Sequence, residues 1–349
     1  MSEQADASAV RSGSQVTVVI MTFDRPDYLE ECLASVGRQT LTGFRLVVLD
    51  NASTADLSGV LDRFRAMPVT YVRNETNIGG AGNFAKAMRE YSDSEYLMIF
   101  HDDDMMHPRM LEWQLDVLER DPEIQFVSTE LAAFDDGAVP PQMVPENADL
   151  DIEVYNDQSD LARSFLGTGG LCFGSTLYRS SVLKRIRPDN DRFGIIGDRP
   201  LLLDAARLGK SALIRAPLVS YRHHPGQDTK TGALTAQNLI ELTKAYREAL
   251  PSDWSRADQE LFYAHSRYFL TQYGYARLAL EERIGAMTFV RKCTRARVLR
   301  FRDFRHGVLE NLMRVDGRRT LPAAIETARA MRRRLSLRRR RDASDRPSS

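Results

Sequence analysis

The chain alternates short apolar runs with segments in which apolar residues recur at helical spacing. The apolar, strand-forming runs lie at 16–20, 44–49, 69–72, 96–100, 126–129 and 211–220. Helical spacing follows residues 26, 83, 108 and 198, so helices are expected between the strands. This alternation predicts an α/β fold with a doubly wound, mostly parallel sheet.

The same pattern divides the chain into four regions. Residues 1–15 are polar and predict a disordered leader, and 16–230 carry the predicted sheet. Residues 231–330 have helical patterning, and 331–349 form an Arg-rich tail that we expect to be disordered. Within the sheet region, 135–160 are rich in Pro, Asp and Asn and predict a long loop.

Three consecutive acids follow the apolar run at 96–100. Asp102, Asp103 and Asp104 would repel one another unless a positive charge lay between them. Ligands of open α/β sheets collect at the carboxyl ends of the strands, which is where these acids are expected. The acids therefore predict a cation or ligand site, with a solvated acidic loop as the alternative.

A net charge of zero hides an uneven distribution of charge. Residues 291–341 hold 18 Lys and Arg against 4 Asp and Glu, a net of +14, which leaves −14 for the rest. This basic segment predicts peripheral contact with an anionic membrane, with a solvated tail as the alternative. Nucleic acid would use the same electrostatics, but past Phe304 the tail lacks interleaved aromatic residues, so no nucleic-acid partner is expected.

Cysteine spacing and hydropathy indicate the cellular setting. Cys32, Cys172 and Cys293 are widely separated, which favours buried thiols in a reduced compartment over disulfides. No apolar stretch approaches the length of a membrane span, and the first residues do not resemble a signal peptide. We therefore expect a cytoplasmic protein, peripheral on the inner face of the cell membrane at most.

A glycine-rich turn precedes the helix predicted after residue 83. Asn77, Gly79 and Gly80 belong to it, and glycine lets a ligand approach the backbone closely. The helix N-terminus would offer free N–H groups to an anion. The spacing differs from a dinucleotide-binding fingerprint, and the turn follows the third strand rather than the first. A simple tight turn is the alternative.

Another acid opens a later helix. Asp198 stands at the start of an apolar helical pattern that stops at Gly209, so its carboxylate is expected at the positive end of a helix. The alternative is an ordinary helix N-cap. Trp113, at helical spacing, is a candidate for the lining of a ligand cleft or for the core.

Taken in order, these segments resemble the inverting family-2 glycosyltransferases of the GT-A fold. The matching segments are 18–26, 50–53, 77–80, 102–104, 197–198 with Gly209, and 221–224. The resemblance spans about 16–230 and implies a GT-A-type catalytic domain with a helical, basic C-terminal extension. It also implies metal-dependent, inverting transfer from a nucleotide-diphosphate sugar to a saccharide or lipid-linked acceptor.

The resemblance implies a role for each acid of the triplet. Asp104 corresponds to the metal-binding end of a D-x-D motif, with Mn²⁺ or Mg²⁺ as the cofactor. Asp102 would face the ribose or the water shell of the metal, and Asp103 would support the other two acids. A histidine after the late strand would complete the metal or phosphate contacts, and the Tyr-Arg-x-His pattern selects His224 over His223.

The resemblance also assigns the nucleotide contacts. Thr22, Asp24 and Arg25 match the contacts of the first loop to the nucleotide, and Asp50 matches the acid that binds the base or ribose. An Asx turn with Asn51 and Ser53 would explain Asp50 equally well.

Asp198 matches the general base of the family. It occupies the position of the Asp in the usual Glu-Asp pair, although Gly197 replaces the Glu and Pro200 replaces the acid that follows. As base, it would accept the proton of the acceptor hydroxyl during attack on the anomeric carbon. The Gly-Gly-Ala-Gly turn is most similar to bacterial rhamnosyl- and galactofuranosyltransferases, which favours a dTDP- or UDP-sugar and cell-surface polysaccharide synthesis.

Two other functions compete with this one. A sugar nucleotidyltransferase would need a Gly-rich, Lys-containing loop after the first strand, and 22–26 is not such a loop. A catalytically silent protein that binds a nucleotide sugar or nucleic acid would not need the acids at 102, 104 and 198. The helical C-terminal part could also support a homodimer.

Overall fold

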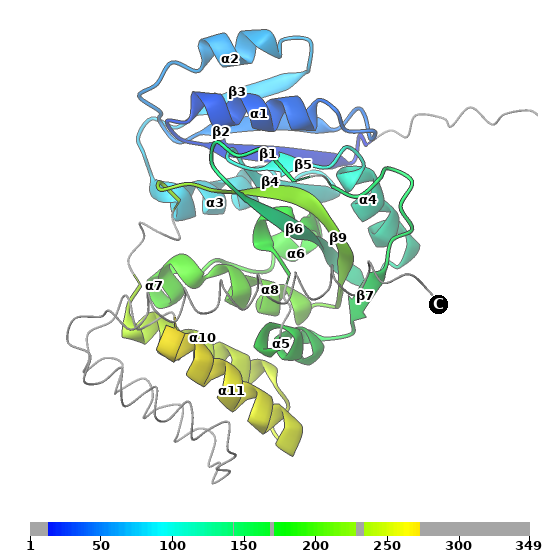
Figure 1. Cartoon of the computed structure of the whole chain (residues 1–349), viewed down its shortest axis with the longest axis vertical. Helices are drawn as coiled ribbons and strands as arrows, with labels where there is room; N and C mark the ends of the chain where they lie inside the picture. The colour runs from blue at the N-terminus through cyan, green and yellow to red at the C-terminus, as the bar shows by residue number, and fades with distance from the viewer. Residues whose placement is uncertain (1–12, 142, 168–170, 228–233, 273–349) are drawn as a thin grey trace, which may run out of the picture. The chain divides into compact units, whose positions relative to one another are not determined.

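The computed structural model describes residues 13–141, 143–167, 171–227 and 234–272 (Figure 1). The chain divides into two compact units. The first comprises Met1–Ala233 and Lys244–Asp253, and the second comprises Leu234–Thr243 and Trp254–Ser349. The predicted leader is almost wholly outside the described residues, and the basic segment 291–341 and the Arg-rich tail are entirely outside them.

A nine-stranded sheet forms the centre of the first unit, with the order β3-β2-β1-β4-β8-β6-β9-β5 and with β7 paired to β9. One half is parallel and consists of β1 (Val16–Thr22), β2 (Arg45–Asp50), β3 (Val69–Arg73) and β4 (Tyr96–His101). Every side chain from Tyr96 to Phe100 is buried, as expected for a central strand covered on both faces.

The other half of the sheet is mixed. It consists of β5 (Met105–Met106), β6 (Ile124–Asp135), β7 (Ile152–Tyr155), β8 (Leu177–Arg179) and β9 (Lys210–His223). β8 joins the two halves through antiparallel pairs with β4 and β6, whereas β6 and β9 pair in parallel. Figure 1 shows β6 and β9 as two long, curved neighbours.

Helices lie between and beside these strands. In the first unit they are α1 (Pro26–Val36), α2 (Ser58–Arg63), α3 (Gly79–Glu90), α4 (Met110–Arg120), α5 (Gln158–Leu166), α6 (Ser180–Leu183), α7 (Asn190–Phe193) and α8 (Asp198–Ala206), with the 3₁₀ turns η1 (Phe173–Ser175) and η2 (Gly194–Ile196). α1 begins at a proline, whose fixed φ suits the first helical position. It buries Leu29, Cys32, Leu33 and Val36 in the core that β1, β2, β4 and α4 share.

Two further helices follow the sheet. α10 (Ala236–Ala249) has its first part in the second unit and its last turns in the first, and α11 (Arg256–Gln272) lies in the second unit. These helices agree with the helical pattern expected after residue 231, as far as the described residues extend.

The α/β fold and the six predicted strands are confirmed, with two corrections. The expected loop at 135–160 contains β7 and the start of α5. Residues 221–223, expected to follow the last strand, belong to β9, because β6 extends to Asp135 and pairs with β9 as far as His223. Polar residues can continue a strand when a neighbouring strand satisfies their backbone groups.

The parallel register places polar residues at one edge of the sheet. Thr22 of β1 lies opposite Asp50 of β2, which lies opposite Arg73 of β3. Met21 lies opposite His101, the last residue of β4. The loops after these strands therefore meet at the carboxyl edge, where the sequence places most of its candidate site residues.

Replacement of Gly209 by alanine tests the tight junction between α8 and β9. A Cβ at this position would lie 2.7 Å from the carbonyl oxygen of Glu123 and from Cγ of Gln125. Because the backbone of β6 cannot move aside cheaply, we expect Gly209→Ala to lower the free energy of unfolding by about 1–3 kcal/mol in urea denaturation.

Gly59→Ala is the matched control. Gly59 lies in α2, and a Cβ there would meet nothing within 4 Å. We expect this variant to be as stable as the native chain or more stable by about 0.4–1 kcal/mol. Equal unfolding midpoints for Gly209→Ala and the native chain would show that the junction is looser than described.

Candidate active site

The loop after β1 contacts the three aspartates that follow β4. Thr22 Oγ1 donates a hydrogen bond to Asp102 Oδ2 over 2.6 Å. Arg25 Nη1 lies 3.4 Å from Asp102 Oδ1 and 3.2 Å from Asp103 Oδ2, and its Nη2 donates to the carbonyl oxygen of Gly226. One guanidinium thus connects the first loop, the acids and the segment after β9.

The three aspartates are buried beside one another. Asp102, Asp103 and Asp104 expose 2%, 7% and 3% of their surface, which excludes a solvated acidic loop. Burial, reinforced by the charge of Asp103, raises the pKa of Asp102 to about 7 and the pKa of Asp104 well above its ordinary value. Both carboxylates are therefore short of positive charge, a deficit that a bound cation would relieve.

Asp102, Asp103 and Asp104 together form what we call the acidic corner. Arg222, near the end of β9, holds it in place. Its backbone N–H donates to Asp104 Oδ1 over 3.0 Å, and its Nε donates to the carbonyl oxygen of Asp103 over 3.1 Å. The rest of the guanidinium pairs with Asp136 over 3.1 Å and with Glu31. Arg222 itself is 4% exposed, whereas the side chains of Glu31 and Asp136 are 49% and 40% exposed, so these two ion pairs lie at the edge of the solvent.

The two adjacent histidines have different surroundings. His224 is buried, and its Nε2 lies 2.8 Å from Asp103 Oδ2. The His223 side chain is 45% exposed, and its Nδ1 lies 3.8 Å from Asp135 Oδ1. The geometry therefore brings His224 into the acidic corner, through Asp103 rather than Asp104, and leaves His223 outside it.

Asp50 is fully buried at the end of β2, and both of its carboxylate oxygens have partners. Oδ1 accepts hydrogen bonds from Ser53 N over 2.9 Å and from Ser53 Oγ over 2.5 Å, so the Asx turn is formed. Oδ2 accepts from the Tyr71 hydroxyl over 2.7 Å. Asp50 thus shapes the loop after β2 in this structure, and its contact with a nucleotide stays a prediction.

Asp24 fixes the same loop from the other side. Its Oδ1 accepts hydrogen bonds from the backbone N–H groups of Thr54 and Ala55, over 2.5 and 2.9 Å, and these bonds lower its pKa. The backbone of Asp24 has a φ of +53°, and the neighbouring Phe23 exposes 38% of its surface. The sequence interpretation overlooked Phe23, although an aromatic residue in a polar loop was the available signal.

Amide side chains hold the glycine-rich turn before α3. Asn51 Oδ1 accepts from Ile78 N and from Asn74 Nδ2, each over 3.0 Å. Asn77 Oδ1 accepts from Asn51 Nδ2 and from Gly79 N, each over 2.8 Å. Gly79, with a φ of +75°, allows the left-handed backbone at this point, and Gly80 follows as the second residue of α3. The turn is therefore preformed beside the end of β2.

Asp198 is the first residue of α8 and is open to solvent. Surrounding protein atoms raise its pKa, while the charge of Arg199 and the backbone N–H groups at the helix start lower it. The net effect is a raised pKa, which makes this carboxylate a stronger base than an ordinary Asp.

The pKa of Cys172 responds to charges from both the acidic corner and Asp198. Burial raises the pKa of its thiol to about 11, and the charges of Asp104 and Asp198 both act on it, Asp104 more strongly. The negative charges of both carboxylates, which lie on different segments of the chain, thus add to the effect of burial on this thiol. Trp113, by contrast, is 6% exposed, packs in the core and stacks on His107 with ring centroids 5.0 Å apart.

The acidic corner suits a divalent cation that is shared with a ligand. Among the described residues, no three His, Cys, Asp or Glu side chains are grouped so as to hold a metal on their own. Mg²⁺ and similar ions in phosphate-transfer sites commonly take one or two carboxylates, with phosphate oxygens and water as the remaining ligands. Asp102 and Asp104 offer hard oxygen donors of that kind and fit this arrangement.

Residues 17–187 match the sequence model described as Glycosyl transferase family 2. Over these residues the chain is similar to this family. The match ends before Asp198 and His224, so it covers the strands from β1 to β8 and the three aspartates but neither of these two residues.

Two bacterial relatives carry names of the same kind. An uncharacterized glycosyltransferase of Haemophilus influenzae is 30% identical over 112 residues, which are 32% of this chain and 37% of that protein. Abequosyltransferase RfbV of Salmonella typhimurium is 31% identical over 96 residues, which are 26% of this chain and 28% of that protein. The matched segments thus span well under two thirds of either relative.

The crystal structure of residues 1–349 of S. aureus TarS with UDP-GlcNAc has a similar fold, with a TM-score of 0.57 at 16% sequence identity. The similarity covers 79% of this chain and 80% of that one. It confirms the GT-A fold expected from the sequence.

The two histidines give a matched pair of variants. We expect His224→Ala to weaken Mn²⁺-dependent binding of UDP or dTDP by about 10- to 100-fold, because Asp103 would lose its buried partner beside the cation. His223→Ala should leave this binding within about twofold, since its side chain lies outside the corner. Isothermal titration measures both, and a larger loss for His223→Ala would contradict the geometry.

Proposed function

We propose that the chain is an inverting glycosyltransferase that moves a sugar from a nucleotide-diphosphate donor to a saccharide or lipid-linked acceptor. The observation that carries the proposal is the buried acidic corner at the carboxyl edge of the sheet, with a separate, solvent-open carboxylate at Asp198. A donor diphosphate needs the first feature, and an acceptor hydroxyl needs the second.

The donor would lie along the loops after β1, β2 and β3. Phe23 offers an exposed aromatic face to a nucleobase, and Arg25 offers a cation beside the acids. Asp102 and Asp104 would hold Mn²⁺ or Mg²⁺ against the two phosphates, where the cation would take up the charge of the leaving diphosphate. The N-terminus of α3, at Gly79 and Gly80, provides further N–H groups at the same edge.

Asp198 would supply the base. Its carboxylate accepts the proton of the acceptor hydroxyl as that oxygen attacks the anomeric carbon from the face opposite the diphosphate. The new glycosidic bond forms as the bond to the diphosphate breaks, so the anomeric configuration inverts. Arg222 and Arg25 act on this step indirectly, because they fix the acids that hold the donor.

The names of the relatives favour bacterial polysaccharide synthesis as the setting. One is named an abequosyltransferase and another an amylovoran biosynthesis glycosyltransferase, of Erwinia amylovora. We keep a dTDP- or UDP-sugar as the favoured donor and the cytoplasm as the favoured location.

Membrane contact and dimerisation remain predictions. In the part of the chain that the structure describes, no helix is long and apolar enough to cross a bilayer.

The proposal is tested by Asp198→Asn, which keeps the shape of the side chain but removes the base. We expect release of the nucleoside diphosphate from UDP- and dTDP-sugars, in the presence of free and lipid-linked saccharides, to fall by about 10²–10⁴-fold. Nucleotide binding should stay unchanged, because the donor contacts lie elsewhere.

Asp62→Asn is the control, since Asp62 is an exposed acid on α2 that lies outside the proposed site. It should release nucleoside diphosphate at the native rate. Full activity of Asp198→Asn would exclude Asp198 as the base, and a native chain that binds nucleotides but never transfers sugar would favour a silent binding protein.

A further inference from the structure

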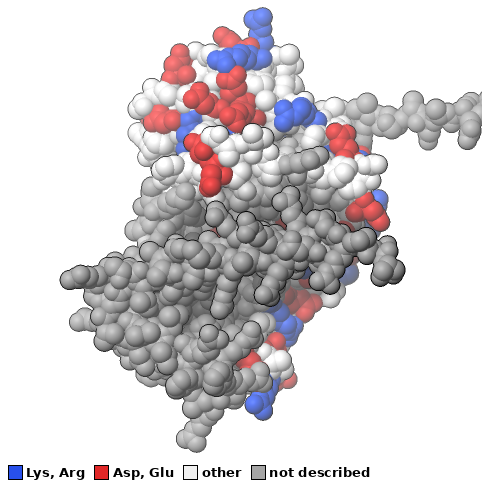
Figure 2. Space-filling view, in the orientation of Figure 1, with Lys and Arg blue, Asp and Glu red and all other residues white. Residues whose placement is uncertain are grey.

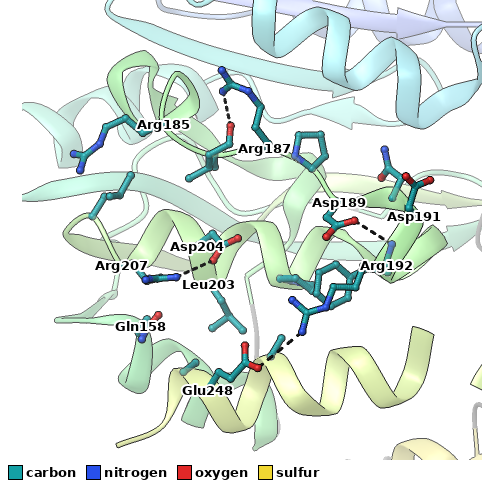
Figure 3. Close-up of a pocket in the computed structure, with 18 residues that line it drawn as sticks. Gln158, Arg185, Arg187, Asp189, Asp191, Arg192, Leu203, Asp204, Arg207 and Glu248 are labelled. Carbon is teal, nitrogen blue, oxygen red and sulfur yellow. Dashed lines mark hydrogen bonds and ion pairs between the residues drawn. The ribbon is translucent and has the colours of Figure 1, made fainter. Parts of the chain in front are cut away.

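A large groove lies in the first unit, away from the acidic corner. It has a volume of about 1040 Å³ and is lined by the segment 185–193, by one face of α8 and by the end of α10 (Figure 3). The part of α10 that contributes, from Ala245 to Ala249, belongs to the first unit. The residues that line the groove take no part in the reaction proposed for Asp198.

The residues of α8 that line the groove and Asp198 lie on opposite faces of this helix. Leu203, Asp204 and Arg207 line the groove, whereas Leu202 and Ala205, on the other side of α8, are buried in the core. In a helix of 3.6 residues per turn, Asp198 falls on the face of Leu202 and Ala205.

A short segment connects the groove to the proposed base. Phe193, in the groove wall, is five residues from Asp198, a span of at most roughly 18 Å even when fully extended. The groove wall at Phe193 and the proposed base therefore lie within that span of each other.

The charges that line the groove balance. Four arginines, at 185, 187, 192 and 207, face four acids, at 189, 191, 204 and 248. A polyphosphate or a polyanion would meet as many carboxylates as guanidinium groups, so the groove provides no net attraction for it. Gln158 and Asn190 add amide groups to the lining.

Several of these groups retain hydrogen-bonding capacity. Among the residues that the structure describes, the Arg185 guanidinium and the Asp191 carboxylate have no hydrogen-bond or ion-pair partner. Arg207 Nη1 lies 3.8 Å from Asp204 Oδ1, a loose ion pair that is too long for a hydrogen bond. Figure 3 shows Asp204 of α8 beside Arg207, the residue that follows this helix, with Glu248 on the facing helix.

Such a lining fits a neutral ligand that has many hydroxyl groups. Guanidinium, carboxylate and amide groups are planar and offer paired donors or acceptors, which match neighbouring hydroxyls on a sugar ring. Pro188, which is half-buried, supplies apolar surface for the C–H face of such a ring.

We propose that this groove binds a neutral oligosaccharide, the part of the acceptor chain that extends away from the reacting hydroxyl. The assignment rests on the proposed glycosyltransferase function, because that function places the acceptor end at Asp198. The groove would hold the chain in place while its end reacts, and it would favour longer acceptors over short ones.

The test is binding of the whole chain to an array of bacterial surface oligosaccharides, some neutral and some bearing phosphate or uronic acid. We expect neutral oligosaccharides to bind. Arg207→Ala and Asp191→Ala should each weaken that binding by about tenfold, whereas Arg65→Ala, an exposed arginine after α2, should not change it.

Nucleotide binding in the presence of Mn²⁺, measured on the same samples, separates this inference from the proposed function. Groove variants that bind nucleotide normally but have lost the oligosaccharide support the assignment. The assignment is wrong if no oligosaccharide binds, if only anionic ones bind, or if Arg207→Ala and Asp191→Ala bind as well as the native chain. A native chain that binds oligosaccharide but no nucleotide would instead overturn the donor site.

Discussion

Three carboxylates buried side by side at the end of β4 are the constraint on which the site depends. Water cannot stabilise them there, and their mutual repulsion raises the pKa of Asp102 and Asp104. Arg25 from the first loop and Arg222 from β9 offset part of this repulsion, because together they contact all three acids. This compensation stays incomplete, and the proposed donor site rests on the remaining need for positive charge, which a bound cation would supply.

Much of the fold could be predicted because local patterns determine it. Buried strands such as 96–100 read as unbroken apolar runs, and Pro26 marks the start of α1. Elements that depend on distant partners were harder to predict. β7 is a short strand in a polar stretch, and it forms because β9 offers it a free edge. The polar end of β9 is a strand only because β6 runs beside it.

The site shows the same division between local and distant signals. The acids and the glycine turn stood out because rare residue types occur close together, and the choice of His224 over His223 agrees with their burial. The hub role of Arg222 was not predictable, since its contacts lie more than 80 residues away in sequence. Whether Asp50 forms an Asx turn or binds a base could not be decided without Tyr71, which occupies its second oxygen. Surface side chains mix both signs of charge over the region of α1 and α2 (Figure 2), so surface charge did not reveal the site either.

The most direct test of the account is calorimetric titration of UDP, dTDP and GDP into the native chain and into Asp104→Ala, each with and without Mn²⁺. The account predicts that UDP or dTDP binds the native chain only when Mn²⁺ is present, and that Asp104→Ala abolishes this binding. Failure of every nucleotide to bind, or equal binding by Asp104→Ala, would contradict the claim that the buried acids form a cation-dependent donor site.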